Sequence, residues 1–207
     1  MPVTELPAMP TRLSTEERQT EIVAAALRLA EAFSPARITT GEIAAAVGVS
    51  QGAVFKHFSS KEAIWLAAMG RVRTQLLQSL DAAAQAAATP LAALAAVFRA
   101  HVDFVVAHPG VPRLIFHELE QPADSAVKQE VRALLQAYRK LLLRLLDAAV
   151  RQGQASAVLD QEAAATLFVG IVQGLVMQSM LSGKPATMKA QADRVFALYL
   201  HGICEVS

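Results

Sequence analysis

Residues 39–58 read TTGEIAAAVGVSQGAVFKHF, and this stretch decides the fold of the N-terminal third of the chain. Its pattern predicts two short helices of about seven residues each, joined by a turn at residues 47–50. Gly48 allows the sharp turn because glycine adopts positive φ without strain, and Ser50 caps the second helix. This spacing is typical of a helix-turn-helix, whose second helix enters the major groove of DNA.

The side chains of this stretch divide between packing and recognition. Ser50 directs the N-terminus of the second helix outward, where free N–H groups and the helix dipole favour phosphate. Gln51, Gly52 and Ala53 lie on the first turn of that helix, where base edges would be met. The apolar residues can hold the two helices against each other and against the preceding helix, and they are Ile43, Ala44, Val47, Val49, Val54 and Phe58.

Local charge supports contact with DNA, although the net charge of the 207-residue chain is only +1. No acidic residue occurs between Glu42 and Glu62, whereas Lys56, His57 and Lys61 do. The two lysines can neutralise phosphates, and His57 can donate a hydrogen bond to one.

Composition and missing motifs narrow the function further. Hydrophobic residues make up 54% of the chain and charged residues 18%, which excludes wholesale disorder. The single cysteine, Cys204, cannot form an internal disulfide framework or a Cys-rich zinc site. The chain has no Gly-rich phosphate loop, no Gly-x-Ser-x-Gly motif and no metal-ligand spacing, so we expect no enzyme, metal or cofactor. The N-terminus lacks the pattern of a signal peptide, which predicts a cytoplasmic protein.

Helix signals dominate the whole chain, and they predict an all-α fold of about nine helices without a sheet. Capping residues mark the starts of the N-terminal helices, namely Ser14 with Glu17, Thr39 or Thr40, Ser50, and Ser59 with Glu62. We expect the first helix to end near residue 34 and the helix after Ser50 near residue 58. The predicted organisation is a flexible arm (1–12), a three-helix DNA-binding domain (13–60) and a larger helical bundle for ligand binding and dimerisation (61–207).

Residues 163–183 contain no charged side chain and match the length of a membrane span. Gln173 and Gln178 interrupt the stretch and no basic cluster flanks it, so we predict no membrane contact but a helix buried in a core or a subunit interface. A membrane-associated or protein-interaction adaptor stays open as the alternative. Together with the last helix, this stretch predicts a four-helix dimer interface that includes Gly170, Gly174, Met177, Leu181, Phe196 and Tyr199.

A ligand pocket is expected between the helices spanning about residues 60–152. Its mixture of aromatic, apolar and few polar side chains favours an aromatic or lipophilic effector. The candidate lining residues are Trp65, Met69, Phe98, His101, Phe104, Ile115, Phe116, Tyr138, Leu142 and Met177.

The segment from about residue 14 to residue 70 resembles the TetR family of bacterial transcriptional repressors. The family pattern is a Thr-led helix, Ile-Ala, Gly-Val-Ser, x-Gly-x-Leu-Tyr-x-His-Phe and Ser-Lys-Glu. The matching residues here are Thr39-Thr40, Ile43-Ala44, Gly48-Val49-Ser50, Gly52, Val54-Phe55, His57-Phe58 and Ser60-Lys61-Glu62. The resemblance implies a homodimeric repressor that binds a palindromic operator on double-stranded DNA and is released by a small-molecule effector.

The resemblance also implies roles for single residues. The positions that contact the DNA backbone in the family are occupied here by Thr39, Thr40, Ser50, Phe55, His57 and Lys61. The positions that contact bases or nearby phosphates in the family are occupied here by Gln51, Gly52, Ala53 and Lys56. Phe55 stands where the family usually has Tyr and cannot make the hydrogen bond of a phenol to phosphate. Ala53 offers only apolar contact, so Gln51 is the best candidate for a hydrogen bond to a base edge. The side-chain amide of glutamine pairs best with adenine.

Overall fold

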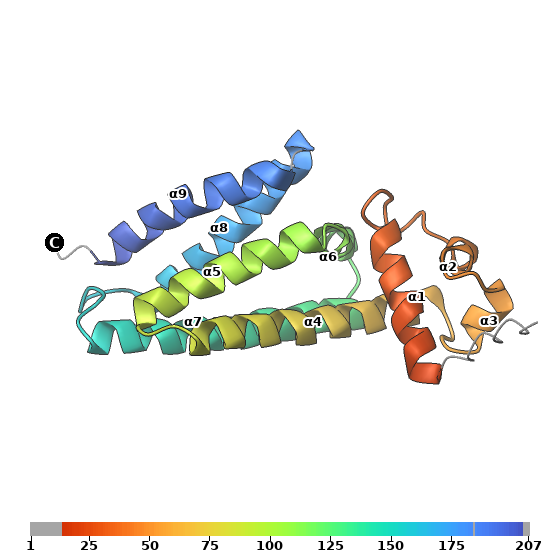
Figure 1. Ribbon diagram of the computed structural model, residues 1–207, viewed down its shortest axis with the longest axis horizontal. Coiled ribbons are helices and arrows are strands. Elements are labelled where there is room, and N and C mark those ends of the chain that lie inside the picture. Colours follow the sequence, from red (N-terminus) through yellow and green to blue (C-terminus); the bar gives the residue numbers. More distant parts are fainter. Residues whose placement is uncertain (1–13, 184, 205–207) are drawn as a thin grey trace, which may run out of the picture.

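The computed structural model describes residues 14–183 and 185–204, and these form nine α-helices and no strand (Figure 1). The predicted all-α fold is therefore confirmed, whereas the predicted arm at 1–12 lies outside the described residues. The helices are α1 (Thr15–Leu29), α2 (Thr40–Ala46), α3 (Gln51–Phe55), α4 (Lys61–Gln85), α5 (Pro90–Ala107), α6 (Gly110–Glu120), α7 (Ala126–Arg151), α8 (Gln161–Ser182) and α9 (Pro185–Cys204).

Local capping sets the starts of the N-terminal helices. Ser14 and Glu17 form the predicted capping box of α1, and of the two candidates for α2 it is Thr39 that caps the helix. At α4 the prediction was one residue early. Ser60 is in the extended conformation and accepts a hydrogen bond from the amide of Ala63 at 3.2 Å, so Ser60 and not Ser59 is the cap.

Two N-terminal helices are shorter than predicted because their last turns tighten. After Leu29 the amide of Glu31 bonds to the carbonyl of Arg28, three residues back, and α1 gives way to turns. After Phe55 the amide of His57 bonds to the carbonyl of Val54 in the same way. Such 3₁₀-type hydrogen bonds, from an amide to the carbonyl three residues earlier, are common where an α-helix ends.

The long helix α4 connects the two parts of the molecule (Figure 1). Its first turns pack against α1, and its remaining length packs against α5 and α7. On the other side of α5, helices α8 and α9 complete the bundle around an aromatic cluster. In this cluster the ring of Phe98 stacks on Phe196 at 4.4 Å between centroids and meets Phe168 edge-on at 5.5 Å.

Helices α5 and α8 are long and apolar enough to cross a membrane by length and composition. Only the second had been singled out from the sequence. Each buries one face in the bundle, with Val97 and Phe98 on α5 and Phe168 and Val172 on α8. The core helix of a water-soluble protein passes the same test, so these two helices are weak evidence for a membrane.

Candidate DNA-binding surface and ligand cavity

Buried apolar contacts hold the helix-turn-helix against α1. Ile43 of α2 and Val54 of α3 are fully buried, and Ile22 of α1 belongs to the same apolar core. Gly48 has φ +69°, the left-handed conformation that the predicted turn requires. The side-chain amide of Gln19 also donates to the carbonyl of His57 at 3.2 Å, which ties α1 to the segment after α3.

The solvent side of α3 carries most of the residues that were predicted to meet DNA. Gln51, Gly52, Phe55 and Lys56 are exposed, and Ala53 is half-buried. Positions 51, 52, 55 and 56 are neighbours on one face of a helix. Ser50 is also exposed, and its hydroxyl accepts the amide of Ala53 at 3.2 Å. The solvent side of this segment therefore presents the polar side chains of Ser50, Gln51 and Lys56 together with the exposed ring of Phe55.

Thr40 and Gln51 are joined by a hydrogen bond across the two helices. Gln51 Nε2 donates to Thr40 Oγ1 at 2.6 Å. The contact holds the amide group of Gln51 in one orientation relative to α2, at the residue predicted to contact a base.

Three other predicted DNA contacts already have partners in the protein or face inward. Thr39 Oγ1 donates to Glu42 Oε2 at 2.9 Å, and these capping bonds lower the pKa of Glu42. Lys61 Nζ donates to the carbonyl of Ala36 at 3.1 Å. His57 Nδ1 is buried without a hydrogen-bond partner among the described residues, so only its Nε2 can reach a phosphate.

A cavity of about 520 Å³ lies between α4, α5, α6, α7 and α8. It includes six residues from the predicted lining, which are His101, Phe104, Ile115, Phe116, Tyr138 and Met177. The other four predicted lining residues are buried in the apolar core and do not line it, namely Trp65, Met69, Phe98 and Leu142. Their side chains are surrounded by neighbouring helices, so this part of the predicted lining is corrected.

The sequence predicted only part of the contribution of α6 to the cavity. Val111, Pro112 and Leu119 also line it, beside the predicted Ile115 and Phe116. Their spacing of three and four residues places them on one helix face, which is the signal that could have identified them.

A polar pair lies in the mostly apolar wall. His101 Nδ1 and Tyr138 Oη are 3.2 Å apart, with their rings edge-to-face. Burial lowers the pKa of His101 to about 4, so the imidazole is neutral at pH 7. Burial raises the pKa of Tyr138 in turn, so its phenol is protonated.

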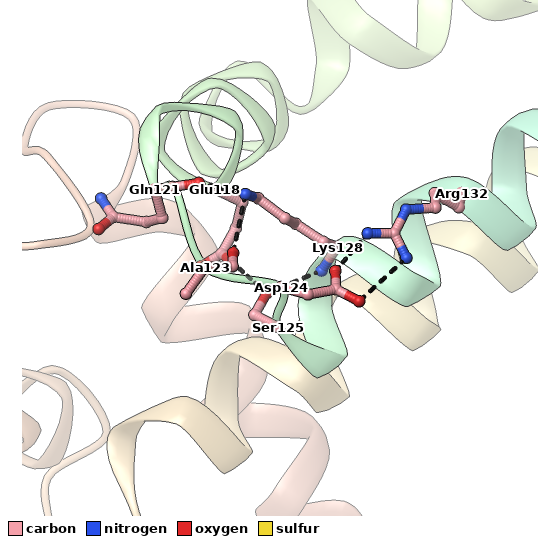
Figure 2. Close-up of polar contacts among 7 residues, drawn as sticks. All are labelled: Glu118, Gln121, Ala123, Asp124, Ser125, Lys128 and Arg132. Atoms are coloured by element: carbon pink, nitrogen blue, oxygen red, sulfur yellow. Dashed lines mark hydrogen bonds and ion pairs between the residues drawn. The ribbon is translucent and has the colours of Figure 1, made fainter.

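The connection between α6 and α7 is fastened by polar contacts (Figure 2). Ser125 Oγ donates to Glu118 Oε2 at 2.7 Å, and Lys128 Nζ donates to the carbonyls of Gln121 and Ala123. These contacts fix the C-terminal end of α6, the helix that forms one wall of the cavity.

The other end of α6 abuts the DNA-binding part. Gly110, its first residue, is buried, and a Cβ built there would lie 2.1 Å from the carbonyl oxygen of Leu27 in α1. The next two residues, Val111 and Pro112, line the cavity. The cavity wall and α1 are therefore in direct backbone contact.

The residues predicted for dimerisation fall into two groups. Gly170, Gly174, Met177 and Leu181 are exposed on α8, and a Cβ at either glycine would meet no atom within 4 Å. Phe196 and Tyr199 instead belong to the aromatic cluster and are only 5% and 3% exposed. The predicted interface is corrected at these two positions, because the apolar face of α9 packs on its own protomer.

Comparisons with known proteins agree with this architecture. The family model described as bacterial regulatory proteins, tetR family, matches residues 22–68, and that described as tetracyclin repressor-like, C-terminal domain, matches residues 118–195. A nucleoid occlusion factor SlmA from Glaesserella parasuis is 27% identical over 183 residues, which covers 87% of this chain and 88% of the relative.

Solved structures share the fold. Bacillus subtilis FadR, in complex with stearoyl-CoA, superposes with a TM-score of 0.77 at 21% identity, covering 89% of this chain and 98% of that one. FadR from Bacillus halodurans gives a TM-score of 0.80 at 19% identity, covering 89% and 95%. With the helix-turn-helix surface, the helical C-terminal part and both family matches in place, the chain belongs to the TetR family and is a DNA-binding transcriptional regulator.

Proposed function

We propose that the protein is a cytoplasmic, homodimeric repressor that binds a palindromic operator and is released when a lipophilic small molecule enters the cavity. The observation that carries the DNA half of this proposal is the exposed surface of α3, where Gln51 at the start of the helix and Lys56 at its C-cap are both open to solvent. A two-fold dimer would present two such faces to a two-fold symmetric site. We propose that the boundary between the DNA-binding and effector domains lies at residue 60, directly before α4 begins at Lys61.

The apolar cavity supports the effector half of the proposal. The known structure of Bacillus subtilis FadR contains stearoyl-CoA, and a lipophilic ligand suits the wall of the present cavity. We propose that such a ligand would displace α6 and, through the contact of Gly110 with Leu27, would move α1 and the helix-turn-helix.

The exposed apolar face of α8 supports the dimer. Leu167, Leu181 and, on α9, Leu198 are 55%, 81% and 74% exposed. Gly170 would allow a second helix to approach closely at the centre of this face. Gly170→Arg should therefore give monomers at low micromolar concentration in sedimentation velocity, whereas Gln78→Arg on the exposed side of α4 should remain dimeric. A dimeric Gly170→Arg protein would argue against this interface.

A gel-shift experiment on DNA from directly upstream of the protein's own gene tests the proposal as a whole. Repeating it at two salt concentrations should show sequence-selective binding that weakens steeply with salt. Failure to bind any duplex, combined with a need for detergent to stay in solution, would instead favour the adaptor reading of α8.

A second candidate function is nucleoid occlusion, because the relative of that name matches over both parts of the chain. The two functions differ in where the protein binds and what it controls. A repressor should occupy a few promoter sites and release them with ligand. An occlusion factor should occupy many chromosomal sites and delay division when overproduced.

A further inference from the structure

The chemistry of the cavity wall restricts what can bind there. Apart from His101, Tyr138 and Gln173, every described lining residue is apolar, and none is Lys, Arg, Asp or Glu. Leu119 and Leu135 are lining residues that are also exposed to solvent, so the exposed part of the wall is apolar as well. A carboxylate or phosphate buried here would lose its hydration without gaining a counter-charge, which costs far more than burying a neutral group.

Several of the cations that flank the lining residues along the chain already have other partners. Arg73, next to Val72, pairs with Glu130 at 2.7 Å. Arg132, next to Val131, pairs with Asp124, and Lys128 donates to loop carbonyls (Figure 2). Arg139, next to Tyr138, pairs with Glu162. Arg71 and Arg113, next to Val72 and Pro112, do not line the cavity either. An anionic head group would therefore meet no cation in the cavity wall, and Arg73, Arg132 and Arg139 could reach it only by leaving an existing ion pair.

The His101–Tyr138 pair has one donor left for a ligand in either tautomer. When the imidazole proton is on Nε2, the phenol donates to Nδ1 and the Nε2–H is free. When the proton is on Nδ1, it is donated to the phenol oxygen, and the phenol proton is free. A buried donor without a partner costs free energy, so the pair favours a ligand with an oxygen that can accept this bond.

We propose that the cavity selects an uncharged lipophile with one hydroxyl or carbonyl oxygen, which accepts a hydrogen bond from the His101–Tyr138 pair. Gln173, exposed on α8, is the other polar lining residue and is not required. The inference rests on the proposed effector role of the cavity and names the chemical class of the effector.

Matched probes of two shapes can test this selection. The ring series is 2-naphthol, 2-naphthoate and naphthalene, and the chain series is 1-decanol and decanoate. Binding to the full-length protein at pH 7.5 is measured by thermal shift and by native mass spectrometry. The alcohol of at least one series should bind and raise the melting temperature by mass action, while the carboxylate of the same size should bind at least tenfold more weakly.

Variants then assign the preference to the pair. Tyr138→Phe and His101→Leu should each weaken binding of the alcohol about tenfold and leave naphthalene within twofold of the parent protein. Tyr199→Phe is the matched control, because Tyr199 donates to the carbonyl of Ala164 outside the cavity, and it should leave the alcohol unaffected.

Three results would overturn the proposal. The first is that the carboxylates bind as tightly as the alcohols. The second is that the preference for the alcohol over the carboxylate survives in both Tyr138→Phe and His101→Leu. The third is that no probe binds. DNA binding by the unliganded protein, selected from a random-sequence duplex library, is followed in parallel. If the parent protein binds no DNA, the proposed regulator function is contradicted. If it binds DNA but the probes do not bind as expected, only the inference about the cavity is contradicted.

Discussion

A Cβ at Gly110 would lie 2.1 Å from the carbonyl oxygen of Leu27, so the first residue of α6 has room only for a hydrogen atom against the backbone of α1. The obstacle is main chain, which cannot rotate aside as a side chain can. This contact is a direct physical path from the cavity wall to α1, which packs against the helix-turn-helix.

Replacing Gly110 with alanine should therefore separate α6 from α1. We expect Gly110→Ala to lower the free energy of unfolding by about 1–3 kcal/mol, the range for inserting atoms into a packed site, as measured by urea denaturation. Gly70→Ala is the control, because a Cβ there makes only an ordinary 3.9 Å contact with Glu130. Since alanine favours helix over glycine, that variant should be unchanged or up to about 1 kcal/mol more stable. Equal stability of the two variants would show that α6 can yield at this point.

Thr40 should influence base choice through Gln51. Removal of the Thr40 hydroxyl frees the side-chain amide of Gln51. Thr40→Val should therefore broaden the base preference at one position of each half-site. Selection from a random duplex library measures this preference. Gln51→Ala should abolish the preference there, with a cost of about 1–3 kcal/mol on the favoured site. Thr40→Ser keeps the hydroxyl and should keep the preference. An unaltered profile in Thr40→Val would dismiss the positioning role.

Phosphate contacts by Lys56 and Lys61 should be visible in the salt dependence of binding. Each substitution to alanine should weaken binding to all duplexes alike and reduce the slope of log K against log salt by about 1 per half-site contact. Lys61→Ala should also loosen the segment at Ala36 that its ammonium holds. Lys140→Ala, an exposed lysine on α7, is the control. A parental slope in the first two variants would remove the phosphate role.

Burial of His101 predicts a dependence of stability on pH. Its pKa is about 4 in the folded protein and 6.5 in the unfolded chain, so the unfolded state binds the extra proton between these values. Stability should therefore fall as pH drops from about 6.5 to 4, by roughly 3 kcal/mol in total. His101→Leu should flatten this part of the profile. Denaturant unfolding at half-unit pH steps measures the effect, and an identical profile in the variant would mean that other groups cause it.

Local signals predicted the helix-turn-helix well because its determinants are near in sequence. Ser14 with Glu17, and Gly48 with its positive φ, act within a single turn. The cavity was predicted only in part, since periodicity marks the inner face of a helix but not whether that face meets a neighbour or a void. Trp65 and Phe98 therefore looked like lining residues, although neighbouring helices cover them.

Contacts between distant segments could not be read from the sequence. The approach of Gly110 to Leu27 depends on how α6 lies across α1, which no local pattern encodes. Phe196 and Tyr199 show the same limit. An apolar helix face looks alike whether it packs on its own protomer or on a second copy.

The most direct test of the regulator is the ratio of its affinities for a library-selected duplex and for a scrambled duplex of equal length and composition, measured at physiological salt. Specific DNA-binding proteins prefer their sites by about 10³-fold or more, and the exposed face of α3 with Gln51 and Lys56 predicts a ratio in that range. A ratio near one would contradict the central claim that this surface reads DNA sequence.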